Sequence, residues 1–119
     1  MDENQAVGAT ISTDVQPAGA VLVLGGDLDV RSTSELRTAV YEHLRTHGTS
    51  GSGRILVDIS QVRSIDATAL KVIAMASRRA RRRGGARVVL RGACPAVRRM
   101  LHLTHLIRLI EVERDRVPA

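Results

Sequence analysis

The chain has 119 residues, a formal net charge of +6, one tyrosine, no phenylalanine or tryptophan, and a single cysteine, Cys94. This length suits one domain with an aliphatic core. The composition excludes aromatic base-stacking modules, an internal disulfide and a multi-cysteine metal site.

The start of the chain predicts a tail and then two strands. Residues 1–8 are polar and are typical of a loose tail. Ala9–Val15 alternates in polarity, which predicts an edge strand. Ala20–Leu24 is an uninterrupted apolar run, which predicts a central strand covered on both faces and ended by Gly25 and Gly26.

The next segment predicts a helix followed by another strand. Ser32 and Glu35 have the spacing of a capping box, and apolar residues then recur at helical spacing up to Gly48. The glycine- and serine-rich stretch over residues 48–53 indicates a surface loop. Ile55–Ile59 predicts a second buried strand.

The second half of the chain continues the alternation. A short turn is expected over Gln61–Ile65, and then a helix that begins at Asp66 and ends near Arg83, before Gly84 and Gly85. Arg87–Leu90 predicts a third core strand, Pro95 a short helix, and residues 108–112 a last strand.

Together these elements predict an α/β fold, a single domain over residues 9–115 with tails at 1–8 and 116–119. Because whole helices connect the strands, the sheet should be mixed but mostly parallel, with helices packed on it. The longest uncharged stretch, Val15–Gly26, is too short to span a bilayer, and the acidic charge of Met1-Asp2-Glu3 is opposite to that expected at the start of a signal peptide. We therefore expect a cytoplasmic protein without a membrane segment.

Catalytic and metal sites find little support. Asp27 and Asp29 could act as an acid–base pair or bind Mg²⁺, but two carboxylates after a strand are more often turn and cap residues. No phosphate-binding glycine motif is present. We expect no enzymatic activity, no metal and no cofactor.

The histidines and the cysteine also have structural explanations. His102 and His105 are three residues apart without a third ligand nearby in sequence, so we interpret them as surface or interface residues. His43 falls in line with Val40 on the first helix and is expected to be a partly buried histidine with its hydrogen bonds satisfied. Cys94 is expected to cap the helix that starts at Pro95.

One segment carries a more specific pattern. The run Val57-Asp58-Ile59-Ser60, then Ile65-Asp66-Ala67-Thr68-Ala69-Leu70, joins a strand end to a helix start, and Gly26-Asp27-Leu28-Asp29 precedes it. Over about residues 19–113 the chain resembles the STAS domain of bacterial anti-sigma factor antagonists. In that family a serine or threonine two positions after the helix-start aspartate is phosphorylated by an anti-sigma factor that is also a serine/threonine kinase.

The resemblance implies that Thr68 is the phosphorylation site, and that the unphosphorylated protein binds the anti-sigma factor and so releases a sigma factor. The family's first serine is replaced here by Ala67 and its glycine by Ala69. The chain is expected to be a monomer or weak homodimer. The residues that the resemblance implies for partner binding are Asp27, Asp29, Ser32, Asp66, Ala67, Thr68 and Ala69.

Two alternatives stay open at this stage. STAS domains also serve as subunits of signalling assemblies and as partners of lipid transporters. The cluster Arg78–Arg83 could instead bind nucleic acid, because residues 67–119 carry 13 basic and 3 acidic side chains. Since cations suit the last turns of a helix, we expect a solvated basic face in preference to a nucleic-acid site.

The position of Thr68 has its own physical consequence. If Asp66 is the N-cap, Thr68 lies in the first helical turn, near the surface and at the positive end of the helix dipole. A phosphate there would be tolerated by the fold. It would oppose docking, because a partner would have to bury a dianion beside Asp66. If Asp27 and Asp29 lie at the same end of the sheet, the dianion would join an already acidic face.

Overall fold

Six strands form one sheet in the order of the sequence in the computed structural model, which describes residues 5–6, 8–17, 19–47, 54–84 and 87–113. The strands are β1 (Gln5–Ala6), β2 (Ala9–Gln16), β3 (Gly19–Leu28), β4 (Arg54–Ile65), β5 (Arg87–Arg91) and β6 (Glu111–Val112). The helices are α1 (Thr33–His47), α2 (Ala67–Gly84), α3 (Pro95–Leu103) and the 3₁₀ helix η1 (Leu106–Arg108).

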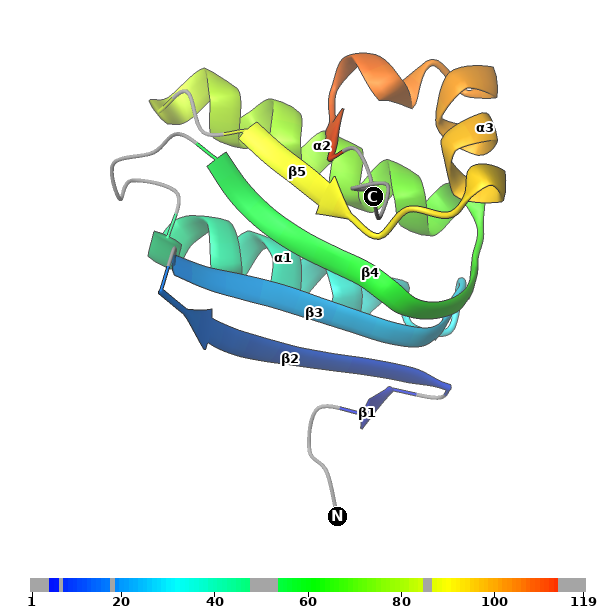
Figure 1. Cartoon of the computed structure of the whole chain (residues 1–119), viewed down its shortest axis with the longest axis horizontal. Coiled ribbons are helices and arrows are strands. Elements are labelled where there is room, and N and C mark those ends of the chain that lie inside the picture. Colours follow the sequence, from blue (N-terminus) through cyan, green and yellow to red (C-terminus); the bar gives the residue numbers. More distant parts are fainter. Residues whose placement is uncertain (1–4, 7, 18, 48–53, 85–86, 114–119) are drawn as a thin grey trace, which may run out of the picture.

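The pairing of the strands confirms the predicted mixed, mostly parallel sheet. β1, β2 and β3 pair antiparallel, whereas β3, β4, β5 and β6 pair in parallel. The parallel pairs need crossover connections, and α1, α2 and α3 provide them. Figure 1 shows α1 and α2 side by side behind the sheet, with α3 beyond the end of β5.

The core is aliphatic and lies between the sheet and the two long helices. Leu36 of α1, Leu70 and Ile73 of α2, Leu24 of β3 and Leu90 of β5 are all fully buried. On α2 the buried residues recur at three- and four-residue spacing, so the helix turns one apolar stripe to the sheet.

β3 is longer than the sequence predicts. The expected end at Gly25 and Gly26 is wrong, because the strand continues to Leu28 through two register shifts against β4. Gly26 has a φ of +74°, and a Cβ built on it would lie 2.0 Å from the carbonyl oxygen of Gly8. The glycines therefore form an irregularity that redirects the strand and lets it continue.

β4 is also longer than expected. The short turn predicted over Gln61–Ile65 is absent, because Gln61 pairs with Gly25, Ser64 with Asp27 and Ile65 with Leu28. The polar residues of this segment are tolerated in a strand because they lie largely exposed. With this extension β4 ends level with β3, at the same end of the sheet.

The two ends of the chain depart from the predictions in opposite ways. Gln5 and Ala6, within the expected N-terminal tail, pair with Thr10 and Ala9 as β1. Near the C-terminus the strand predicted from residue 108 is mostly wrong, because η1 occupies Leu106–Arg108 and β6 retains two residues. The loop over 48–53 and most of both tails lie outside the described residues.

Candidate functional site

The carboxyl ends of β3 and β4 meet the first turn of α2. Leu28, the last residue of β3, pairs with Ile65, the last residue of β4. The backbone N–H of Asp66 then donates to the carbonyl oxygen of Leu28 over 3.1 Å. The strand register and this bond place the segment after Leu28 beside the start of α2.

Asp66 is the N-cap of α2, as the sequence predicts. Its Oδ1 accepts a hydrogen bond from the backbone N–H of Ala69 at 2.8 Å, which satisfies one of the otherwise unpaired donors of the first turn. Ala67 and Thr68 are exposed, whereas Ala69 is fully buried. The hydroxyl-bearing side chain of Thr68 therefore lies at the surface, in the first turn of the helix.

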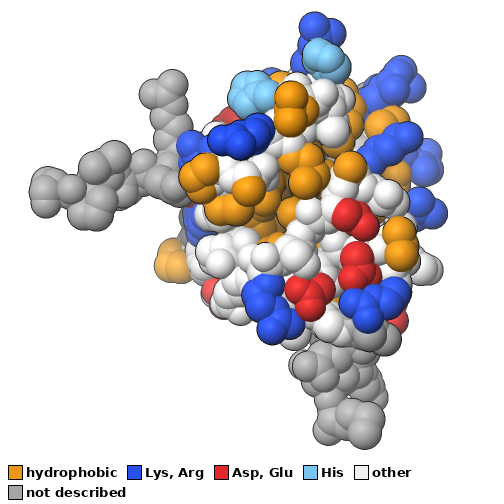
Figure 2. Space-filling view, turned by 90° about the vertical axis from the view of Figure 1, so that its right-hand side faces the viewer, with side chains coloured by type: hydrophobic (Ala, Val, Ile, Leu, Met, Phe, Trp, Pro, Cys, Tyr) orange, Lys and Arg blue, Asp and Glu red, His pale blue; other side chains and the backbone are white. Residues whose placement is uncertain are grey.

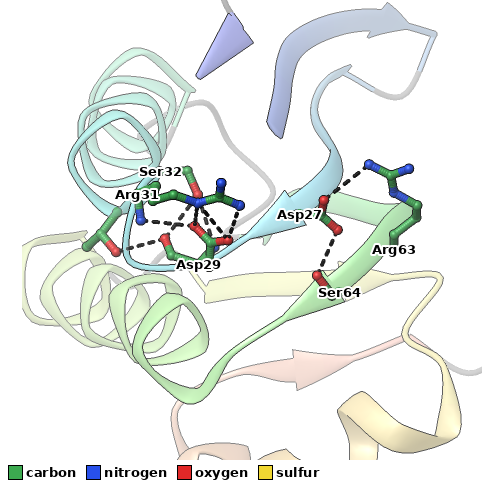
Figure 3. A network of polar contacts seen from close by, with 7 residues as sticks. Asp27, Asp29, Arg31, Ser32, Arg63 and Ser64 are labelled. Atoms are coloured by element: carbon green, nitrogen blue, oxygen red, sulfur yellow. Dashed lines mark hydrogen bonds and ion pairs between the residues drawn. The ribbon is translucent and has the colours of Figure 1, made fainter. Parts of the chain in front are cut away.

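Asp27 joins the ends of β3 and β4 through its side chain. One carboxylate oxygen accepts from the hydroxyl of Ser64 at 2.8 Å, and the other pairs with Arg63 at 3.1 Å. Its backbone N–H donates to the carbonyl oxygen of Gly8 at 2.7 Å. Figure 3 shows Asp27 between Arg63 and Ser64, with both partners coming from β4.

Asp29 and Ser32 form the turn that leads into α1. The hydroxyl of Ser32 accepts from the N–H of Asp29 and donates to its carbonyl oxygen, both at 3.1 Å. The predicted capping box is therefore not the arrangement found, because this hydroxyl turns back to Asp29. Ser32 is fully buried.

Arg31 pairs with Asp29 at 2.8 Å and also donates its backbone N–H to the same carboxylate at 2.9 Å. The side-chain hydrogen bond from Arg31, followed by the backbone one, lowers the pKa of Asp29 below its ordinary value. The same contact raises the pKa of Arg31. Asp29 is therefore ionised throughout the neutral range, with its charge already matched (Figure 3).

We name the surface formed by these residues the strand-end face and define it by Asp27, Asp29, Arg31, Arg63, Asp66 and Thr68. Figure 2 views the molecule from this end and shows acidic side chains beside basic ones, with hydrophobic side chains above them. The expected acidic face is thus a face of paired charges. Arg31 and Arg63 partly neutralise the two aspartates that the sequence singles out.

Arg31 and Arg63 are the residues that sequence reasoning misses. Arg31 is two residues from Asp29, and the polar turn around it gives a weak local signal. Arg63 is 36 positions from Asp27, so their pairing follows from the register of β3 and β4. No spacing rule within one element indicates it.

The other candidate residues lie apart from this site. Cys94 is at the N-cap position of α3, but its side chain makes no capping hydrogen bond. His102, on α3, and His105, the αL residue before η1, are exposed. Among the described residues, no group of three or more His, Cys, Asp or Glu side chains is arranged to hold a metal ion.

His43 is more deeply buried than the sequence predicts and is not satisfied. It is 5% exposed, and its Nε2 has no hydrogen-bond partner among the described residues. Burial, and then the charge of His47, lower the pKa of His43 to about 4. The ring centroids of the two histidines are 4.7 Å apart. His43 lies in the wall of an open groove of about 380 Å³ between α1 and the β2–β3 edge of the sheet.

No helix in the described part of the chain has the length and apolar character needed to cross a membrane.

No curated protein matches the chain at a significant level of sequence similarity.

Several solved structures share the fold. An anti-sigma factor antagonist from Mycobacterium paratuberculosis is 22% identical with a TM-score of 0.70, and the match covers 90% of this chain and 86% of that one. The anti-sigma factor antagonist SpoIIAA, solved in its unphosphorylated form, is 14% identical with a TM-score of 0.66, covering 89% and 90%. The protein TM1081 from Thermotoga maritima is 24% identical with a TM-score of 0.67, covering 85% and 78%.

Most of the chain matches one family model. Residues 11–111 match the model described as "Mlab, STAS domain", so the match runs from β2 to β6 and includes every residue that defines this face. The chain belongs to the STAS domain family.

Proposed function

We propose that this protein is an anti-sigma factor antagonist that binds its partner through the strand-end face. In its unphosphorylated form it binds an anti-sigma factor with serine/threonine kinase activity and so releases a sigma factor. Phosphorylation of Thr68 ends the binding. The protein itself acts by binding, as a cytoplasmic monomer or weak homodimer, and needs no cofactor.

The observation that carries this proposal is the exposed side chain of Thr68 in the first turn of α2, next to the cap residue Asp66. A kinase must bring the acceptor hydroxyl into its own active site, so an acceptor has to be accessible. The fold shared with anti-sigma factor antagonists supports the same assignment.

The surroundings of Thr68 explain why a phosphate there would weaken binding without disturbing the fold. The unpaired N–H groups and the dipole at the start of α2 favour negative charge, so the helix tolerates the modification. A docked partner would have to desolvate a dianion that has Asp66 two residues away. Arg31 and Arg63 already pair with Asp29 and Asp27, so neutralising the phosphate with them would break existing ion pairs.

The residues implied for partner binding differ in solvent exposure, and we propose different roles for them accordingly. Ala67 and Thr68 are exposed and Asp27, Asp29 and Asp66 are half-buried, so we propose that these five contact the partner. Ser32 and Ala69 are fully buried. We propose that they hold the turn before α1 and the start of α2 in place.

The test is a kinase and binding assay with the cognate anti-sigma factor. Incubation with ATP should place one phosphate on Thr68, identified by mass spectrometry, and Thr68→Ala should remove it. Thr68→Glu should weaken binding by about 100-fold, because several kcal/mol of desolvation is added to the interface.

The matched control is Thr46→Glu, which adds the same charge at an exposed position in the last turn of α1. Because Thr46 lies outside the strand-end face, this variant should leave the affinity within about threefold of the wild-type value. That is well below the tenfold change that about 1.4 kcal/mol would cause. Phosphate found at another residue, or equal weakening by both glutamates, would contradict the proposal.

A second candidate function rests on the description of the matching family model, which names Mlab. In this alternative the chain is a STAS subunit of a lipid-transport complex or of a signalling assembly. Size-exclusion chromatography of the native protein separates the two. Elution within a stable large complex supports the alternative, whereas a free monomer or dimer supports the antagonist.

A further inference from the structure

The last turns of α2 carry a dense group of arginines. We name this group the arginine end and define it by Arg78, Arg79, Arg81, Arg82 and Arg83. All five are exposed, and Ala80 between them is half-buried.

These arginines are not neutralised within the described part of the protein. The ion pairs found there use Arg31, Arg45, Arg54, Arg63, Arg87 and Arg91, and none includes a residue of the arginine end. The negative end of the helix dipole favours cations in the last turn. That effect accounts for Arg81, Arg82 and Arg83 but fades before Arg78 and Arg79.

The helical repeat gathers four of the five on adjoining faces. Arg78 and Arg82 are four residues apart, as are Arg79 and Arg83, so each pair lies on one face of the helix. Arg79 is also held in place, because its guanidinium lies 5.4 Å from the centroid of the Tyr41 ring. Like charges this close repel one another, and an anion bound between them would remove that cost.

The arginine end lies far from the strand-end face. Arg78 is ten residues after Thr68, and at 1.5 Å per residue this is about 15 Å along α2. Figure 1 shows α2 running the length of the sheet, from the carboxyl end of β4 to the opposite edge. The two surfaces therefore do not overlap.

We propose that the arginine end binds the phosphate backbone of double-stranded nucleic acid without sequence preference. Guanidinium groups suit phosphate oxygens, and closely spaced exposed arginines match a linear array of phosphates. This activity is separate from the antagonist function and does not rest on it.

Other polyanions fit the surface less well. An anionic membrane is bound best when apolar residues flank the cations, and the described large exposed apolar residues, Val15, Val30 and Leu103, all lie outside α2. Single strands are gripped by aromatic stacking. The chain has one tyrosine and no other large aromatic residue, and Arg79 already covers that ring.

The experiment measures binding of a labelled, mixed-sequence DNA duplex by fluorescence anisotropy as salt is raised. If four arginines contact phosphates, affinity should fall by about 150-fold between about 50 and 200 mM salt, from a log–log slope near −3.6. The variant Arg78→Gln, Arg82→Gln, Arg83→Gln should bind at least about tenfold more weakly at the lower salt, with a slope near −1.

The matched control is Lys71→Gln, Arg99→Gln, Arg108→Gln, which removes the same net charge from exposed positions elsewhere. It should keep a slope near that of the wild-type protein. Glutamine and arginine have similar helix propensity, and circular dichroism would verify that both variants are folded. Phosphatidylglycerol vesicles and a single strand of the same length complete the comparison.

Tighter binding to the duplex than to both other probes, lost in the first variant alone, supports the proposal. Equal losses in the two variants would show an effect of net charge and overturn it. Tighter binding to vesicles or to the single strand, or no duplex binding at the lower salt, would also overturn it.

Discussion

Asp66 and Thr68 lie two residues apart at the start of α2 and differ in what their side chains contact. The Asp66 carboxylate accepts the N–H of Ala69, while the Thr68 side chain is exposed. Substitutions at the two positions should therefore separate stability from binding.

Removing the cap at Asp66 should lower stability. Asp66→Ala leaves the N–H of Ala69 without its acceptor, and we expect the free energy of unfolding to fall by about 1 kcal/mol. Urea denaturation measures this change. Asp66→Asn retains an acceptor and should lose less, so equal losses in the two variants would contradict the capping role.

The buried His43 should make stability depend on pH. Its pKa is lowered from 6.5 to about 4 in the folded protein, so the unfolded chain binds more protons between these values. Stability is therefore retained above about pH 6.5 and lost as the pH falls. Between about pH 7.5 and 4.5 the loss attributable to His43 should be about 2 kcal/mol.

The measurement is urea denaturation at the two pH values for the wild-type protein, for His43→Leu and for His102→Gln. His43→Leu should lack this part of the pH dependence, while His102→Gln, at an exposed position, should retain it. Parallel pH profiles for the wild-type protein and His43→Leu would be the contrary result.

Local spacing predicts some of these residues and not others. Asp66 is recognisable as a cap because a helical apolar pattern starts directly after it. The helical position of His43 predicts a partly buried side chain, but not that its Nε2 lacks a hydrogen-bond partner among the described residues. The pair of Asp27 and Arg63 depends on strand register, which the sequence leaves undetermined.

At the scale of the elements, β3 depends on the backbone conformation of one residue, Gly26. Gly26 has a positive φ and lies against the carbonyl of Gly8, so the neighbouring Asp27 can donate its N–H to that same carbonyl. The glycine pair that suggests a strand end in the sequence allows the strand to bend and continue.

Gly26→Ala should therefore be strongly destabilising. The new Cβ would collide with backbone and the residue would adopt an unfavourable φ, so we expect a loss of more than about 2 kcal/mol. Gly84→Ala is the matched control, because nothing lies within 4 Å of a Cβ there. Thermal unfolding should show a large drop in Tm for the first variant and little change for the second.

Periodicity predicts the long elements well, because α1, α2 and the apolar parts of β3, β4 and β5 bury continuous stripes. It fails where a strand continues through polar residues, as at Gln61–Ser64. There the strand is held by pairing with β3, and no buried apolar stripe marks it in the sequence. It also fails near the C-terminus, where residue 108 belongs to η1 and the strand predicted over residues 108–112 is reduced to β6.

At the scale of the whole molecule, the fold separates charge along its length. The strand-end face combines aspartates with arginines, whereas the arginines at the opposite end of α2 form no ion pair within the described residues. The sequence shows this asymmetry as a basic second half, but the distance between the two surfaces follows from the straight run of α2 along the sheet.

This separation predicts that the two binding events are independent. Thr68→Glu should change the affinity for a DNA duplex by less than about twofold, because the added charge lies beyond a Debye length of about 8–10 Å at physiological salt. Anisotropy titrations of the wild-type protein and Thr68→Glu measure this. A large shift would show that the surfaces are coupled.

The contact between Arg79 and Tyr41 also gives the protein an intrinsic optical probe. With no tryptophan in the chain, ultraviolet emission arises from this one phenol, and the cation over its ring belongs to the arginine end. Any ligand that draws the guanidinium away alters the environment of the fluorophore, so occupancy there can be followed without attaching a dye.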